Sequence, residues 1–250
     1  MSIFSNDIAA NMKGIIVEEC DQGKELTSDA LSDDQIDALD AQEKLSALTG
    51  MGDFLAHLEV SGEYTGAHSA EKKYSIHHMH PNDVGFDDRK CMVDMVESDL
   101  KQLYNDAWGW DRAGKFDELF GAGSHLFVAR PIQAKCEDTP IPCIAGFVMI
   151  RFCWDDDDEP EFPVVYVYEL NVNSLERGSG LGRHLMQLVK RIQVKWGLWK
   201  VMLTCFKDNA AALAFYRKIG FDIDVYSPSR VQGWEPVKYE IMSNAPDKIM

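Results

Sequence analysis

Residues 163–197 read PVVYVYELNVNSLERGSGLGRHLMQLVKRIQVKWG and hold three consecutive elements. Val, Tyr and Leu crowd residues 163–172, as in a buried β-strand. Apolar residues recur at helical spacing over residues 180–197, which predicts an amphipathic helix. Three glycines lie at the junction, at Gly178, Gly180 and Gly182. We therefore predict a strand, a glycine-rich loop and a helix in direct succession.

This glycine-rich loop is suited to an anion. Glycines let the backbone approach a ligand closely, and the free amides at a helix start favour negative charge. The loop does not fit G-x-x-x-x-G-K-[ST], which excludes a P-loop. It opens like the Rossmann pattern G-x-G-x-x-G, but Arg183 stands at the last position. Two interpretations remain, a pyrophosphate cradle and a plain turn.

Further strands and helices surround this unit. Residues 89–110 carry one apolar helical stripe, and residues 209–220 form a second helix that Gly220 ends. Val, Ile, Phe and Tyr mark the other strands, which we place at residues 71–80, 125–130, 141–153, 199–206, 221–226 and 238–243. The order predicts an α/β (α+β) fold with a mixed central β-sheet flanked by helices.

The amino-terminal part differs in composition. Residues 17–44 contain ten acidic residues and two lysines, and Leu31, Ile36 and Leu39 have the spacing of a short helix. We therefore expect residues 1–60 to form a partly helical acidic extension and residues 61–250 to form the main domain.

The charge of the chain restricts its partners. The 250 residues include 25 Lys and Arg against 41 Asp and Glu, a net charge of −16. This balance argues against direct binding to nucleic acid or to an anionic membrane, and it suits a cationic partner or simply a soluble protein. No 18-residue apolar run or C-x-x-C pair is present, and residues 1–14 show neither the charged nor the apolar region of a signal peptide, so we do not expect secretion. We expect a protein of the cytoplasm and nucleus with reduced cysteines.

Two motifs in this order resemble the GCN5-related N-acetyltransferase (GNAT) superfamily. The first is R-x-x-G-x-G at residues 177–182, which in that family binds acetyl-CoA. The second is N-x-x-A-x-x-F-Y-x-x-x-G-F at residues 209–221. The resemblance covers roughly residues 120–243 and implies a GNAT fold with acetyl-CoA as the acetyl donor.

Five further segments resemble the NatD family, the N-alpha-acetyltransferases dedicated to histone amino termini. They are WGWDR (108–112), YVYEL (166–170), RGSGLGR (177–183), VMLTCFKDN (201–209) and FDIDVYSPS (221–229). The substrates of that family are histones four and two-A, whose tails begin Ser-Gly-Arg-Gly. The resemblance implies basic histone tails as the partners, with a monomeric enzyme.

The catalytic residues are assigned through this resemblance. Glu169 becomes the general base, acting through a water, with Tyr168 beside it; Tyr216 stands where many relatives have a tyrosine that protonates the coenzyme thiolate. Strand alternation puts Tyr166 and Tyr168 on one face and Glu169 on the other, so a bulge is needed to bring them together. Without the resemblance, a sheet-edge or structural carboxylate is the alternative interpretation of Glu169, and core packing is the alternative for Tyr166 and Tyr168.

The resemblance also assigns the cofactor contacts. The backbone of the strand end pairs with the pantetheine arm, the glycine-rich loop holds the pyrophosphate, and Asn209 contacts the cofactor further along. The residues are Leu170, Asn171, Val172, Arg177, Gly178, Ser179, Gly180, Leu181, Gly182, Arg183 and Asn209.

Substrate contacts are expected from aromatic and acidic side chains. The acidic run at residues 155–159 either grips the basic tail or is a solvated hairpin. The resemblance supplies the remaining contacts, and the full set is Tyr104, Trp108, Asp155, Asp157, Glu159, Tyr166, Tyr168, Thr204 and Tyr239.

No metal site is predicted. His77, His78 and His80 form an H-H-x-H group, but no further ligand follows at a recognised spacing. The chemistry implied by the resemblance needs no metal.

We therefore expect an enzyme that transfers acetyl from acetyl-CoA to the amino-terminal serine of histones four and two-A. Two alternatives remain: a GNAT enzyme acting on a lysine or small amine, and a non-catalytic acidic protein that binds histones.

Overall fold

The computed structural model describes residues 62–67, 72–132, 143–155, 162–231 and 237–244. The expected acidic extension, residues 1–60, and the substrate candidates Asp157 and Glu159 lie outside these ranges. No helix among the described residues is long and apolar enough to cross a membrane.

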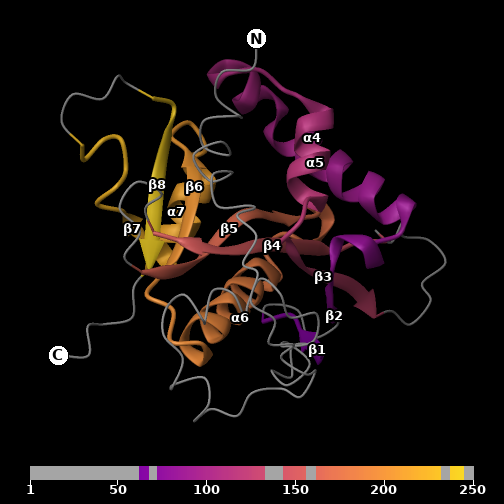
Figure 1. The fold of residues 1–250 in the computed structure, drawn as a ribbon. Helices are drawn as coiled ribbons and strands as arrows, with labels where there is room; N and C mark the ends of the chain where they lie inside the picture. The colour runs from indigo at the N-terminus through magenta and orange to yellow at the C-terminus, as the bar shows by residue number, and fades with distance from the viewer. Residues whose placement is uncertain (1–61, 68–71, 133–142, 156–161, 232–236, 245–250) are drawn as a thin grey trace, which may run out of the picture.

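The centre of the molecule is a mixed β-sheet with the strand order β1-β2-β3-β4-β5-β6-β8-β7 (Figure 1). Neighbouring strands are antiparallel except β5 and β6, which are parallel. The strands are β1 (Gly62–Thr65), β2 (Lys73–Met79), β3 (His125–Ile132), β4 (Gly146–Trp154), β5 (Pro163–Val172), β6 (Val201–Phe206), β7 (Asp222–Ile223) and β8 (Tyr239–Asn244). The predicted α/β fold with a mixed sheet is confirmed.

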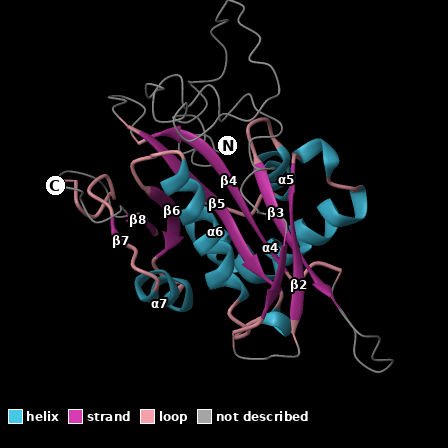
Figure 2. Cartoon of the chain, turned by 90° about the horizontal axis from the view of Figure 1, so that it is seen from below, coloured by secondary structure: helices cyan, strands magenta, loops and turns pink. Residues whose placement is uncertain are grey.

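Helices cover both faces of this sheet (Figures 1 and 2). The described helices are α4 (Phe86–Ala107), α5 (Arg112–Phe120), α6 (Leu181–Lys195) and α7 (Ala210–Lys218), with short 3-10 turns η1 (Pro81–Asp83) and η2 (Ser174–Glu176). Residues of α4 and α5 share one apolar core with the sheet, and residues of α6 and α7 share the other. The sequence analysis placed α4, α6 and α7 but missed β1 and α5.

Helix α6 shows why the sequence folds in this way. Its buried residues include Leu181, Leu185, Val189 and Ile192, spaced four, four and three apart, so they form one stripe against the sheet. The left-handed backbone of Gly180, with φ of 93°, lets the chain turn directly from the loop into the helix. The strand–loop–helix order is as predicted.

Two irregularities of β5 position the functional groups. Within the described strands, β5 and β6 pair only over residues 165–167 and 201–203, so the carboxyl-terminal half of β5 has no β6 partner. The β4–β5 register also shifts between Met149 and Ile150, which leaves Tyr168 as an extra residue in β5. The bulge anticipated from the sequence is therefore present.

Candidate active site

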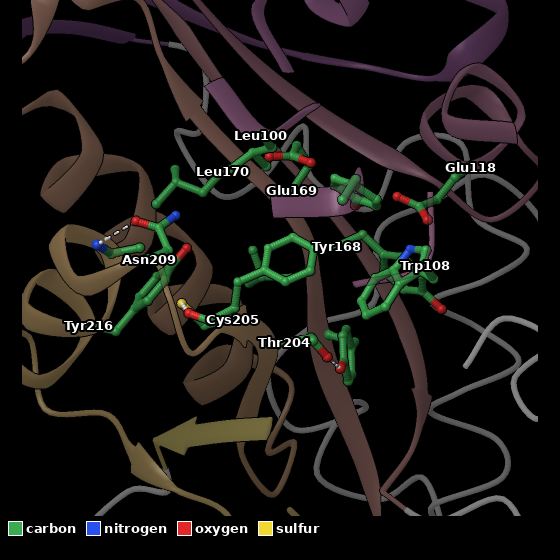
Figure 3. Close-up of a pocket in the computed structure, with 15 residues that line it drawn as sticks. Leu100, Trp108, Glu118, Tyr168, Glu169, Leu170, Thr204, Cys205, Asn209 and Tyr216 are labelled. Atoms are coloured by element: carbon green, nitrogen blue, oxygen red, sulfur yellow. Dashed lines mark hydrogen bonds between the residues drawn. The ribbon is translucent and has the colours of Figure 1, made fainter. Parts of the chain in front are cut away.

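A cavity opens where β5 and β6 separate, and α4 and α7 close it from the sides (Figure 3). We name it the Glu169 cavity after its central carboxylate. Its lining consists of Leu100, Tyr104, Trp108, Glu118, Tyr166, Val167, Tyr168, Glu169, Leu170, Thr204, Cys205, Phe206, Asn209, Ala212 and Tyr216. Seven of the sequence-predicted catalytic and substrate residues thus lie around one space: Tyr104, Trp108, Tyr166, Tyr168, Glu169, Thr204 and Tyr216.

Glu169 is a buried carboxylate, with 6% of its surface exposed. Its Oε2 lies 3.6 Å from Nζ of Lys115, a buried lysine on α5. Lys115 also forms an ion pair with Glu118, one turn further along the same helix. One cation therefore serves two carboxylates, and its contact with Glu169 is longer than a hydrogen bond.

Burial raises the pKa of Glu169 to about 7, with a smaller contribution from the charge of Glu118. The charge of Lys115 opposes this rise but does not cancel it. For Lys115 itself, burial disfavours the charged form, yet the neighbouring carboxylates outweigh it and raise its pKa well above the usual value. A carboxylate whose pKa lies near neutrality can accept and release a proton in the physiological range.

The bulge decides which side chains face this carboxylate. With regular alternation Tyr168 and Glu169 would point to opposite faces. In the structure Tyr168 packs against the core beneath α4 and α5, and Glu169 contacts Lys115 of α5, so both lie on the same face. Tyr166 lies beside Tyr168, with ring centroids 5.2 Å apart, and its hydroxyl pairs with Thr204.

An aromatic wall borders the cavity on the α4 side. Tyr104 and Trp108 are one helical turn apart, with ring centroids 5.6 Å apart, and Phe206 of β6 packs against both. Nζ of Lys115 lies 4.9 Å from the centre of the Tyr104 ring, a cation–π contact. Tyr239 stands behind this wall at 6.0 Å from Trp108 and is not part of the cavity lining.

Tyr216 comes from α7, on the opposite side of the cavity from the aromatic wall (Figure 3). Burial raises its pKa above the usual range, so the phenol keeps its proton at neutral pH. A raised pKa makes the phenol a weaker acid, so the role of Tyr216 as proton donor rests on the family resemblance and stays a prediction.

A second hollow, the glycine-loop cleft, continues from the first. The two share Leu100, Leu170, Asn209, Ala212 and Tyr216. Its further lining is Asp99, Asn171, Val172, Glu176, Arg177, Gly178, Gly180, Leu181, Gly182, Arg183, Ala211, Phe215 and Lys218. Of the sequence-predicted cofactor residues, only Ser179 is missing from this lining; it is buried behind the loop.

The geometry of this cleft fits an extended ligand with an anionic end. Gly178 and Gly180 both have positive φ, at 78° and 93°, and a Cβ on Gly180 would lie 2.8 Å from the Tyr64 hydroxyl. The first turn of α6 begins directly after them; the amide of Leu181 donates to the Ser179 hydroxyl at 3.3 Å, and the amides of Gly182 and Arg183 follow at the helix start, which favours an anion. Leu170, at the end of β5 that has no β6 partner, lies between this loop and Glu169.

Two predicted cofactor residues are held by Asp99 of α4. Its Oδ2 accepts from Arg177 at 2.5 Å and from Asn171 at 3.1 Å. The side-chain oxygen of Asn171 is buried without a hydrogen-bond partner, and Asn209 caps α7 by accepting from the amide of Ala212. These contacts fix the walls of the cleft, and the role of each residue toward a cofactor stays a prediction.

Asp155 is not in the Glu169 cavity. Its carboxylate accepts from the amide of Phe162 at 2.8 Å and from the hydroxyl of Tyr226 at 3.3 Å, so it holds together the two ends of the β4–β5 connection. The contact of Asp155 with substrate stays a prediction, whereas these hydrogen bonds show that Asp155 stabilises the β4–β5 connection.

Sequence reasoning missed the charged partners of Glu169. Lys115 and Glu118 lie on α5, which the prediction of one helix over residues 89–110 left out. A signal was present: Asp111 caps α5 by accepting from the amide of Ala113, and Phe116, Leu119 and Phe120 follow with helical spacing.

Comparison with known proteins identifies the class of this fold and site. The family model of the GNAT acetyltransferases matches residues 92–221, which include the aromatic wall, Glu169 and the glycine-rich loop. The chain belongs to the GNAT acetyltransferase family.

Individual relatives match over shorter stretches. Mycothiol acetyltransferase of Rhodococcus erythropolis is 32% identical over 114 residues, which are 46% of this chain and 36% of that protein. N-alpha-acetyltransferase 40 of Saccharomyces cerevisiae is 37% identical over 70 residues, 25% of each chain. A GNAT acetyltransferase structure from Staphylococcus aureus is 12% identical, covers 68% of this chain and 98% of that one, and has a TM-score of 0.47. The chain spans less than half the length of the curated relatives it matches.

Proposed function

We propose that this protein transfers acetyl from acetyl-CoA to the α-amine of protein amino termini, and that its substrates are the Ser-Gly-Arg-Gly tails of histones four and two-A. The observation that carries the proposal is the buried Glu169 carboxylate, with a pKa of about 7, in a cavity that joins the glycine-loop cleft. The family of the chain supports acetyl transfer.

The glycine-loop cleft is the proposed site for acetyl-CoA, which supplies the thioester as a cosubstrate. The amides of Gly178, Gly180, Gly182 and Arg183 would face the pyrophosphate, where the start of α6 favours negative charge, whereas those of Ser179 and Leu181 donate within the protein. The backbone from Leu170 to Val172 pairs with β4 on one side and has no β6 partner on the other, and this open side would accompany the pantetheine arm toward Glu169.

In the proposed mechanism, Glu169 accepts a proton and Tyr216 donates one in the Glu169 cavity. Glu169, directly or through a water, accepts a proton from the substrate ammonium group and leaves a nucleophilic amine. The amine nitrogen bonds to the thioester carbonyl carbon, and the carbon–sulfur bond breaks. Tyr216, which is protonated at neutral pH, donates its proton to the leaving thiolate, and the second proton that the acylated nitrogen gives up restores the phenol. An α-amine, whose ordinary pKa is near 8, loses its proton more readily than a lysine side chain does.

The choice of an amino-terminal substrate rests on three observations. One relative is named an N-alpha-acetyltransferase. The net charge of −16 favours a basic tail, and the aromatic wall of Tyr104, Trp108 and Phe206 narrows the space beside Glu169. We also propose that the protein acts as a monomer in the cytoplasm and nucleus.

A small-molecule acceptor is the second candidate. Several relatives are named mycothiol acetyltransferase, a name that does not refer to a protein amino terminus. This candidate needs the same Glu169 chemistry but no groove for a peptide.

The test is acetyl transfer to a Ser-Gly-Arg-Gly-Lys peptide with a free amino terminus, beside the same peptide with a blocked one. Mass spectrometry locates the acetyl group. Acetylation of the terminal serine alone supports the proposal. Activity on the blocked peptide indicates a lysine substrate, and activity on a panel of small amines without activity on either peptide indicates the second candidate. Binding of acetyl-CoA without any transfer would contradict both.

A further inference from the structure

Three histidines meet at the edge of the sheet away from the Glu169 cavity. His78 lies near the end of β2, His80 two residues later, and His125 at the start of β3. Each offers a ring nitrogen, and these three nitrogens all lie within 4.8 Å of one another. Nε2 of His78 and Nδ1 of His125 are 3.2 Å apart.

Strand pairing brings these residues together. His78 and His80 are two positions apart, so their side chains point to the same face. Met79 pairs with Leu126, which puts His80 opposite His125 one step further along the ladder. The rings of His78 and His125 lie against Phe127 and Phe152, which belong to the core shared with α6. Glu169 contacts α5 on the other face of the sheet.

The spacing of the nitrogens suits a metal ion. A tetrahedral ion with metal–nitrogen bonds of about 2.0–2.1 Å holds neighbouring nitrogens about 3.3 Å apart. The nitrogens of His78 and His125 already have nearly this separation. The ring centroid of His80 lies 4.8 Å from that of His78 and 5.2 Å from that of His125. Ion binding requires the nitrogen of His80 to approach the other two and the rings of His78 and His125 to turn from each other toward the ion.

We propose that His78, His80 and His125 bind one Zn²⁺ ion. Imidazole nitrogens are common zinc ligands, and three of them leave a fourth coordination position for a water.

Binding is balanced in protons. The 3.2 Å contact between His78 and His125 holds one hydrogen between two ring nitrogens. When both nitrogens bind the ion, each neutral ring keeps a single proton on its other nitrogen. The exchange replaces one hydrogen bond by two metal bonds and releases no net proton.

The position of the site indicates a structural role. His80 comes directly before η1 and α4, and α4 carries Asp99, Tyr104 and Trp108 toward its other end. A bound ion would therefore fix the start of this helix to β2 and β3. Because the site lies apart from the Glu169 cavity, it does not depend on the proposed acetyl transfer.

The experiment uses the full chain without a polyhistidine tag, stripped with a chelator and titrated with Zn²⁺ against a chromogenic competitor. We expect one zinc per chain. His80→Asn and, separately, His125→Gln should each weaken binding by at least about tenfold. His77→Asn is the matched control, because His77 is exposed on the same strand and lies outside the cluster; it should bind zinc as the wild type does.

Two further readouts keep the test decisive. Co²⁺ in place of Zn²⁺ should give the intense visible absorption of a tetrahedral site without the near-ultraviolet thiolate band that cysteine ligands produce. Zinc should raise the melting temperature of the wild type and of His77→Asn but not of folded His80→Asn, with folding checked by circular dichroism. Absence of zinc binding by the wild type, or binding that survives in both ligand variants, would overturn the proposal; in that case the contact between His78 and His125 is a hydrogen bond between strands and nothing more.

Discussion

Two buried acid–lysine pairs in this molecule have opposite properties. Asp224 and Lys200 lie 2.8 Å apart, and Asp224 also accepts from the amide of Tyr226. Burial alone would raise the pKa of Asp224, but these hydrogen bonds outweigh it and lower the pKa. Glu169 is equally buried, yet its lysine stands at 3.6 Å and is shared with Glu118, and its pKa rises to about 7.

The comparison separates a structural carboxylate from a reactive one. A buried acid whose oxygens are fully satisfied stays ionised and holds the fold together. A buried acid with one distant, shared cation is ready to exchange a proton with a ligand. The exposed surface alone does not distinguish the two acids, because both are almost inaccessible to solvent.

The largest effect is expected at Glu169. Glu169→Gln removes the proton acceptor but keeps the shape of the side chain, so turnover should fall by roughly 10²- to 10⁴-fold while acetyl-CoA still binds. Steady-state kinetics and calorimetric titration with acetyl-CoA measure the two quantities. Undiminished turnover would remove Glu169 as the base.

Asp224→Asn should affect stability and not chemistry. It leaves the buried Lys200 cation without its counter-charge, which typically costs about 3–5 kcal/mol of unfolding free energy. Urea denaturation gives this value, and turnover per folded molecule should match the wild type. A variant as stable as the wild type would mean that Asp224 does not hold the fold together, and the contrast with Glu169 would then be lost.

The pH dependence of stability should differ in sign between the two acids. Glu169 has a raised pKa in the folded state, so the stability that its protonated form contributes is lost as pH rises through about 7, by up to about 3 kcal/mol. Asp224 has a lowered pKa, so its contribution is present at neutral pH and is lost only in acid, as pH falls through the folded-state pKa.

Unfolding of Glu169→Gln and wild type near pH 5.5 and near pH 8.5 checks this expectation. The free energy of unfolding of the variant, relative to that of the wild type, should be greater at the higher pH. An equal difference at both values would show that Glu169 does not titrate in this range.

Smaller effects should come from the two neighbours of Glu169. Lys115→Met removes the charge that lowers the pKa of Glu169, so the rise of kcat/KM with pH should move to higher pH. Glu118→Gln removes a charge that raises this pKa, so the same limb should move downward. The diagnostic result is that the pH at which kcat/KM rises moves in opposite directions in the two variants, because general damage to the site would not move it in opposite directions.

The sequence predicted most of the fold because the patterns are local. Helical spacing in residues 180–197 and the β-branched run at 163–172 each depend on neighbours within a few residues. The boundary near Trp110 was wrong for the same reason. A helix pattern does not show that Gly109, with φ of 99°, ends α4 and that a new helix begins at Arg112.

By itself the sequence therefore determined the strand–loop–helix unit, the family resemblance and the identity of the central carboxylate. Only the tertiary structure decided what surrounds these groups. The bulge at Tyr168 turned Glu169 toward α5, Lys115 became its partner across 54 positions of sequence (169 − 115), and His125 joined two histidines that it follows by more than 40 residues. Such contacts depend on strand register and on helix packing, and a one-residue shift in register changes them without altering the local pattern that predicts each element.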